Sequence, residues 1–95
     1  MYFGNQRVIE DSVERLGINA DDVVIEIGSG NGQALAEIKK HEPSKIYAVE
    51  ISEEFRTGLQ SRFKGENITI IGNDASDLAG IIPDKTVNKI LLILS

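Results

Sequence analysis

Apolar residues recur along the chain at two spacings, which predict a lead-in helix followed by alternating strands and helices. Between residues 5 and 16, Ile9, Val13 and Leu16 fall on one helical face, and Gly17 follows where a left-handed cap would end the helix. Four short apolar runs are typical of buried strands, namely 23–27, 46–50, 68–71 and 87–94. The pattern therefore predicts an α/β chain.

Two helices are expected between the first three strands. The first runs from about Gln33 to His41, because Pro43 forbids its continuation. The second is capped by Ser52 and ends near Gly65. Strands joined by helices favour a parallel sheet with right-handed crossovers and the strand order 3-2-1-4. We therefore predict a single Rossmann-like half-domain with four mainly parallel strands, built from the helix 5–16 and a core over 22–95.

A glycine-rich segment stands between the first strand and the helix after it. It reads Glu26-Ile27-Gly28-Ser29-Gly30-Asn31-Gly32, and its missing side chains would let a ligand contact backbone amides at a helix N-terminus. The dinucleotide fingerprint G-x-G-x-x-G requires a glycine at position 33, where this chain has Gln33. Glu26 would also repel a diphosphate, whereas it would favour a ligand with ammonium or sulfonium charge. A glycine turn kept only for close strand-helix packing is the alternative.

This acid-x-G-x-G-x-G loop resembles the first motif of the class I methyltransferases that use S-adenosyl-L-methionine. The resemblance covers nearly the whole chain, and the chain covers only part of the family's usual domain. It implies S-adenosylmethionine as the cofactor and S-adenosylhomocysteine as a second ligand. The methionine part of the cofactor would then lie beside the residues of the loop, Glu26, Gly28, Ser29, Gly30 and Gly32.

Two further residues follow the second strand. Glu50 stands 22 positions after Gly28 (50 minus 28), and a carboxylate there can accept hydrogen bonds from both hydroxyls of a ribose. The resemblance implies that role, and a helix-flanking acid without a ligand is the alternative. Ile51 comes next, and by the same resemblance it packs on the adenine face or else caps the core beneath the helix.

An adenine site is expected after the third strand. Asp74 and Ala75 resemble the family's third motif, in which an acid accepts from the adenine amino group and the next amide meets the ring. A carboxylate beside a free N–H complements the adenine edge, which has one donor and one acceptor there. Asn73 or Asp77 could take the place of Asp74, and a plain turn residue is the alternative.

Composition limits the partners of the chain. Its net charge of -5 provides no electrostatic drive toward nucleic acids or anionic membranes. The adjacent Lys39 and Lys40 suit the last turn of a helix better than a docking patch. No apolar run approaches the roughly 20 residues of a membrane span, so we expect a cytoplasmic location. The absence of Cys and the single His41 leave no cluster of transition-metal ligands.

Groups that would catalyse methyl transfer are not evident. The reaction needs an aligned acceptor and, in some cases, a base, and we nominate no catalytic residue and no acceptor. Because the sequence stops just after the fourth strand, we expect a fragment whose apolar edge strand 87–94 mediates homo-oligomer formation. Two alternatives stay open, a self-associating half-fold that binds no cofactor and a nucleotide or NAD binding module.

Overall fold

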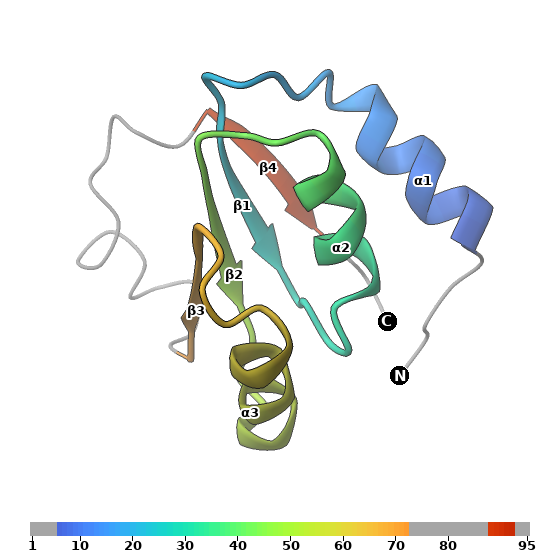
Figure 1. Cartoon of the computed structure of the whole chain (residues 1–95). Coiled ribbons are helices and arrows are strands. Elements are labelled where there is room, and N and C mark those ends of the chain that lie inside the picture. Colours follow the sequence, from blue (N-terminus) through green and yellow to red (C-terminus); the bar gives the residue numbers. More distant parts are fainter. Residues whose placement is uncertain (1–5, 73–87, 93–95) are drawn as a thin grey trace.

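Four parallel strands form a sheet in the order β3-β2-β1-β4 (Figure 1). The structure is a computed structural model, and it describes residues 6–72 and 88–92. Central strand β1 places Ile25 beside Tyr47 on one neighbour and Ile90 on the other. The fold class and the strand order match the prediction from the sequence. The strands are β1 Val23–Ile27, β2 Lys45–Val49, β3 Ile68–Ile71 and β4 Lys89–Leu92.

In the described part of the chain three helices accompany the sheet, and α1 lies alongside α2 (Figure 1). Their bounds are α1 Gln6–Arg15, α2 Gln33–Lys40 and α3 Glu53–Arg62, each within a residue or a few of the expected bounds. The predicted cap of α3 is present, because the Ser52 side chain accepts a hydrogen bond from the Phe55 amide (3.4 Å). Two acids in the first turn of α3, Glu53 and Glu54, suit its positive end.

Apolar side chains cluster on both faces of the sheet, so its strands are almost continuously apolar, although Ile90 of β4 is 60% exposed. The larger cluster joins strand residues to all three helices, and its members include Val13, Val24, Leu35, Ile38, Ile46 and Leu59. The smaller cluster lies on the opposite face and consists of Ile25, Val49 and Ile71 with partly buried neighbours. Since side chains alternate along a strand, Glu26 shares the helix-covered face with Val24.

A polar network fixes the amino ends of three strands around Asp22, which is only 4% exposed. The Asp22 carboxylate accepts hydrogen bonds from the Asn19 amide (2.9 Å) and from the Asn88 side chain. Asn88 in turn accepts from the Val23 amide (2.7 Å), and the Ser44 amide donates to the Asp22 carbonyl (2.8 Å). The hydrogen bonds from Asn19 and Asn88 lower the pKa of the Asp22 carboxyl. The network therefore connects the starts of β1, β2 and β4.

Asp22→Asn should destabilise the fold at neutral pH and matter less in acid. A carboxyl whose pKa is lower in the folded state stabilises the fold above its unfolded pKa, and that contribution is lost as the pH falls through the folded value. Urea unfolding at about pH 7 and about pH 3 measures the free energy of unfolding of both proteins. The difference between the unaltered chain and the variant should be smaller at the lower pH. Asp21→Asn removes the same charge from the exposed adjacent position and is the control. An equal gap at both pH values would show that the Asp22 charge is not involved.

Candidate functional site

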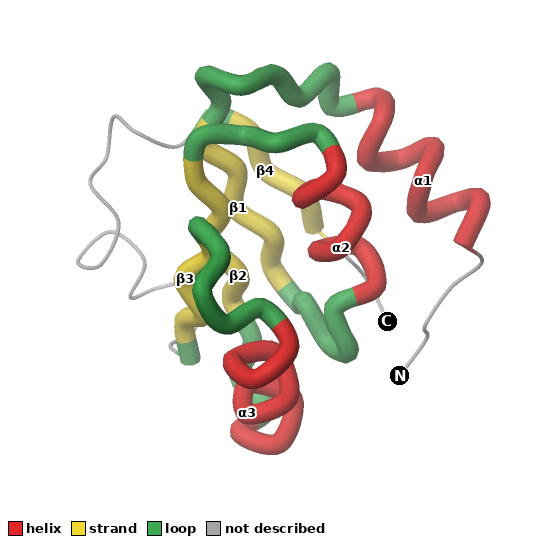
Figure 2. Tube along the Cα trace, viewed as in Figure 1, coloured by secondary structure: helices red, strands yellow, loops and turns green. Residues whose placement is uncertain are grey.

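The glycine loop follows the carboxyl end of β1, one of the two inner strands of the sheet (Figure 2). The amides of Gly28 and Ser29 both donate to the Val49 carbonyl, at 2.9 and 3.3 Å, so the loop is anchored to the end of β2. All three loop glycines adopt positive φ, with values of 85° at Gly28, 53° at Gly30 and 89° at Gly32. A side chain would be strained in this conformation, so the loop requires glycine for its backbone path alone.

Gly32 has a second reason to lack a side chain, since it is the N-cap of α2 and lies against α3. A Cβ at this position would stand 2.9 Å from the Leu59 side chain and 3.0 Å from the ring of Phe63. The packing alternative for the glycine turn therefore applies to Gly32. The close approach also means that α3 packs directly against the end of the glycine loop.

Glu26 is a fully buried carboxylate in the last part of β1, with 0% of its surface exposed. Among the described residues, neither of its carboxylate oxygens has a hydrogen-bond partner in good geometry, and the same holds for the buried hydroxyl of Ser29, although Ser29 lies close enough to influence the carboxyl. Burial raises the pKa of Glu26 to about 7, the Glu50 carboxylate acts in the same direction, and the Ser29 side chain opposes them. A buried ionised group without a partner is costly, so this arrangement calls for a ligand that brings positive charge or hydrogen-bond donors.

Glu50 lies one residue beyond β2 and is 6% exposed. One carboxylate oxygen accepts a hydrogen bond from the Gly30 amide (2.7 Å), and the other accepts from the Ser52 amide (2.9 Å). The side chain therefore joins the glycine loop to the turn after β2. Each oxygen keeps a lone pair that can accept from a hydroxyl group, since a carboxylate has about four acceptor positions.

The remaining predicted residues have different outcomes. Ile51 is 70% exposed, so the alternative that it caps the core is wrong, and its side chain is free to meet a ligand. Asp74 and Ala75 lie outside the described residues, as do their possible substitutes Asn73 and Asp77. The predicted adenine site therefore stays a prediction.

Gln33 has a role that the sequence reasoning missed. Its side-chain amide donates to the Gln6 side-chain oxygen (2.7 Å), and Gln6 donates to the Glu37 carboxylate (2.8 Å). These contacts join the first turn of α1 to α2 beside the glycine loop. The sequence showed only that Gln33 stands where a dinucleotide-binding site has glycine. That observation argued against a dinucleotide site and did not predict a contact with Gln6.

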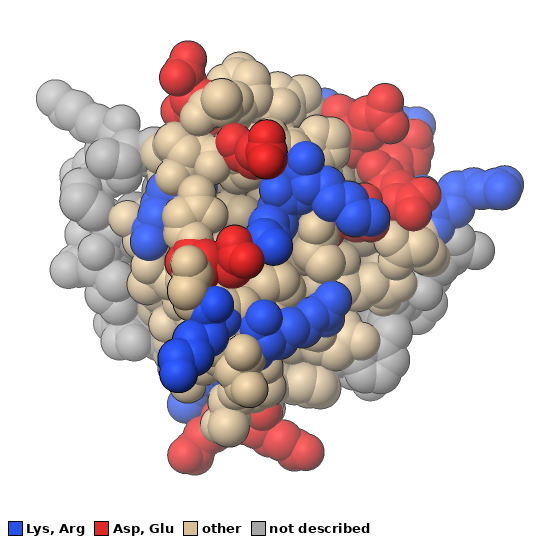
Figure 3. Space-filling view, in the orientation of Figure 1, with Lys and Arg blue, Asp and Glu red and all other residues tan. Residues whose placement is uncertain are grey.

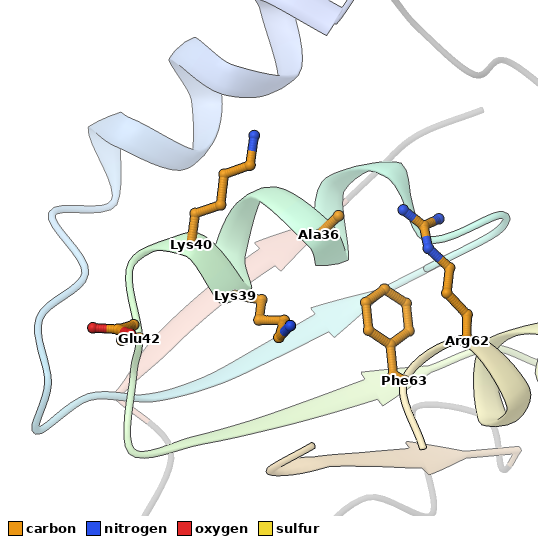
Figure 4. Close-up of a pocket in the computed structure, with 6 residues that line it drawn as sticks. All are labelled: Ala36, Lys39, Lys40, Glu42, Arg62 and Phe63. Atoms are coloured by element: carbon orange, nitrogen blue, oxygen red, sulfur yellow. The ribbon is translucent and has the colours of Figure 1, made fainter. Parts of the chain in front are cut away.

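Basic side chains gather on the face that carries α2 and α3 (Figure 3). They border a pocket of about 480 Å³, which is lined by Ala36, Lys39, Lys40, Glu42, Arg62 and Phe63 (Figure 4). Lys39 pairs with Glu66 at 3.0 Å and Lys40 with Glu37 at 2.7 Å, so nearby acids compensate both lysines. Arg62 donates to the Asn31 carbonyl (3.0 Å). Both lysines lie in the last turn of α2, as predicted, and the expectation that they form no docking patch stays a prediction.

Residues 6–72 and 88–92 contain neither a cluster of metal ligands nor a membrane-spanning helix. That part of the chain contains no group of three or more His, Cys, Asp or Glu placed to hold a metal ion. It also contains no helix with the length and apolar character needed to cross a membrane. The candidate site is accordingly the glycine loop with its two carboxylates.

Comparison with known proteins assigns the family. Residues 1–80 match the family model described as ribosomal RNA adenine dimethylase. The chain belongs to this family. The adenine dimethylase family uses S-adenosylmethionine, and the resemblance to an N-terminal region of class I methyltransferases is confirmed.

One relative agrees with the adenine dimethylase assignment, and another is a methyltransferase with a different name. Ribosomal RNA small subunit methyltransferase A of Persephonella marina is 39% identical over 72 residues, which cover 75% of this chain and 27% of the relative. A probable cobalt-precorrin-6B C(15)-methyltransferase of Methanococcus maripaludis is 34% identical over 85 residues, covering 85% of this chain and 44% of the relative. The chain thus spans less than half the length of these relatives.

A solved structure supports the fold independently. A dimethyladenosine transferase from Plasmodium falciparum superposes with a TM-score of 0.82 at 17% identity, covering 100% of this chain and 34% of the other. At that identity the likeness concerns the fold alone, and it supports the parallel sheet with the order β3-β2-β1-β4.

Gly32→Ala should destabilise the chain by roughly 1–3 kcal/mol, because the added methyl group combines a strained positive φ with overpacking against α3. Gly17→Ala is the matched control, since Gly17 also has a positive φ (63°) but a Cβ there would meet nothing within 4 Å. Its cost should stay near about 1 kcal/mol. Urea denaturation of both variants measures the difference, and equal costs would show that contact with α3 is unimportant.

Proposed function

We propose that this chain binds S-adenosylmethionine at the carboxyl ends of β1 and β2. The observation that carries the proposal is the set of three buried polar atoms without partners, the two Glu26 oxygens and the Ser29 hydroxyl, at the base of the glycine loop. Buried polar groups in folded proteins are nearly always satisfied, so an unsatisfied cluster at a loop of this kind favours a ligand. The family membership supports the same cofactor.

The charge of the site favours a cation over a phosphate. Glu26 and Glu50 both border the loop, and the Glu50 carboxylate disfavours the ionised form of Glu26. An ammonium or sulfonium group relieves that repulsion, whereas a diphosphate adds to it. The NAD alternative is further disfavoured because Gln33, which replaces the fingerprint glycine, is engaged with Gln6.

Each part of the cofactor has a proposed partner in the chain. The amino group of the methionine portion would lie toward Glu26 and Ser29, the ribose hydroxyls would donate to Glu50, and the adenine would lie toward Ile51 and the residues after β3, where Asp74 and Ala75 are proposed. When bound, the cofactor supplies a methyl group on a positively charged sulfur. The residues of this chain would bind and orient that group for in-line attack.

For a protein that contains this chain, we propose ribosomal RNA adenine as the methyl acceptor. The support is the family description and the name of the Persephonella relative. The net charge of -5 gives this segment little attraction for RNA, so we assign cofactor binding to it and leave acceptor binding to other regions of such a protein. A half-fold without cofactor gains no support from the comparisons.

Glu26→Gln should weaken S-adenosylhomocysteine binding by at least about tenfold near pH 8, because the amide keeps the shape but cannot balance the ligand's ammonium charge. In the unaltered chain the affinity should rise between about pH 6 and pH 8 as Glu26 loses its proton, and the variant should lack this rise. Isothermal titration in two buffers of different ionisation enthalpy would also detect the proton released on binding.

Glu14→Gln, on the exposed side of α1, is the control for the lost charge and should bind like the unaltered chain. Failure of the unaltered chain to bind S-adenosylhomocysteine at millimolar concentration would contradict the proposed function. Equal affinity in Glu26→Gln would instead contradict the assignment of the ammonium group to Glu26.

The same variant should be more stable without ligand. A carboxyl whose pKa is raised by folding costs stability once the pH exceeds its unfolded value, so the unaltered chain loses stability as the pH rises from about 4.5 to about 7. Glu26→Gln should remove that loss and raise the free energy of unfolding near pH 8 by about 1–3 kcal/mol. Thermal unfolding at pH 5 and pH 8 measures this, and a destabilised variant at pH 8 would contradict the unpartnered state of the carboxylate.

A further inference from the structure

Arg56 connects the turn after β2 to the body of α3. One nitrogen of its guanidinium donates to the carbonyl of Glu50 (3.1 Å) and to the carbonyl of Ile51 (2.7 Å). These are the two backbone positions that carry the proposed ribose acid and the proposed adenine contact. The Arg56 side chain is half-buried, so solvent only partly competes for these hydrogen bonds.

The same guanidinium also lies against the end of β3. Gly72 follows Ile71, and a Cβ built on Gly72 would stand 2.7 Å from the Arg56 Nε, 2.8 Å from Cζ and 2.9 Å from Cδ. Unlike the glycines of the loop, Gly72 does not have a positive φ. Its backbone would therefore accept alanine, and the new methyl group would have to displace the Arg56 guanidinium.

We propose that Arg56 is a positioning residue for the adenosine part of the cofactor, holding the Glu50–Ile51 turn in place while filling the space left open by Gly72. The inference rests on the proposed cofactor site. Arg56 itself lies behind the turn and contacts its carbonyls, so it acts through Glu50 and Ile51 rather than on the ligand.

The physical reason is the geometry of the Glu50 turn. The Glu50 carboxylate is fixed by two amides, Gly30 and Ser52, which set the direction of the side chain. Within residues 6–72 and 88–92, the backbone of the turn has one hydrogen bond to a neighbouring strand, from the Glu50 amide to the Ile71 carbonyl (2.9 Å). Arg56 is a charged donor to the carbonyls of Glu50 and Ile51, and it restricts the backbone of the turn. Without that restriction the Glu50 carboxylate could turn away from the ribose.

Arg56→Ala should weaken S-adenosylhomocysteine binding by about tenfold, because the freed turn would have to be ordered again when the ligand binds. Gly72→Ala should weaken it to a similar extent, because the new methyl group displaces the guanidinium. Gly58→Ala is the matched control. It lies in α3, a Cβ there would meet nothing within 4 Å, and the variant should bind like the unaltered chain.

The double variant separates positioning from general damage. With Arg56 replaced by alanine, Gly72→Ala has nothing left to displace, so the double variant should bind like Arg56→Ala alone and the two effects should not add. Arg56→Lys keeps a charged donor and should restore part of the affinity. Additive losses in the double variant would overturn the inference.

The ratio of affinities for S-adenosylhomocysteine and its 2′-deoxy analogue tests the contact between Glu50 and the ribose. A general loss of stability would not change this ratio. The unaltered chain should prefer S-adenosylhomocysteine to its 2′-deoxy analogue, and in Arg56→Ala this preference should fall toward one because Glu50 no longer holds its direction. Binding by the unaltered chain with an unchanged preference in Arg56→Ala would overturn this inference and leave the proposed function standing. Absence of binding by the unaltered chain would overturn both.

Discussion

The energetic state of Glu26 dominates the site. A carboxylate placed in the central strand, covered on its face by helices and left without a hydrogen bond, stores unfavourable free energy in the unliganded fold. The loop that follows the carboxylate contains three glycines with positive φ, so few side chains stand between the carboxylate and a ligand. A ligand that brings positive charge would relieve this unfavourable free energy, and the relief would contribute to its affinity. Binding sites are often less stable without their ligands for this reason.

The second organising contact is the hydrogen bond from the Gly30 amide to Glu50. It makes the glycine loop and the turn after β2 one unit, since neither can shift without breaking it. Support comes from behind both segments: α3 packs against Gly32, and Arg56 of the same helix holds the carbonyls of the turn. The helix that follows β2 is therefore the common support of the loop and of the turn, although the residues proposed to contact the cofactor lie before it.

Much of this architecture could be predicted from the sequence because it depends on local patterns. β-Branched runs, the Ser52 cap and the glycine spacing determined the strands, the start of α3 and the position of the loop. The burial of Glu26 and the pairing of Gln33 with Gln6 depend on contacts between distant segments, which no local pattern reports. Arg56 looked like an ordinary helix residue, and only the approach of Gly72 in space distinguishes it. Cofactor binding, self-association and the location of the chain stay predictions.

Two acids at opposite ends of β1 respond to pH in opposite directions. Asp22, at the amino end, has a lowered pKa and stabilises the fold only when ionised, whereas Glu26, four positions later, has a raised pKa and costs stability when ionised. Protonation of Asp22 in acid therefore removes a stabilising interaction at the start of the strand. Ionisation of Glu26 toward neutral pH adds an unfavourable term near its end. From these two groups alone, the unliganded fold should be most robust in mildly acidic solution, and a bound cation would extend that optimum toward neutrality.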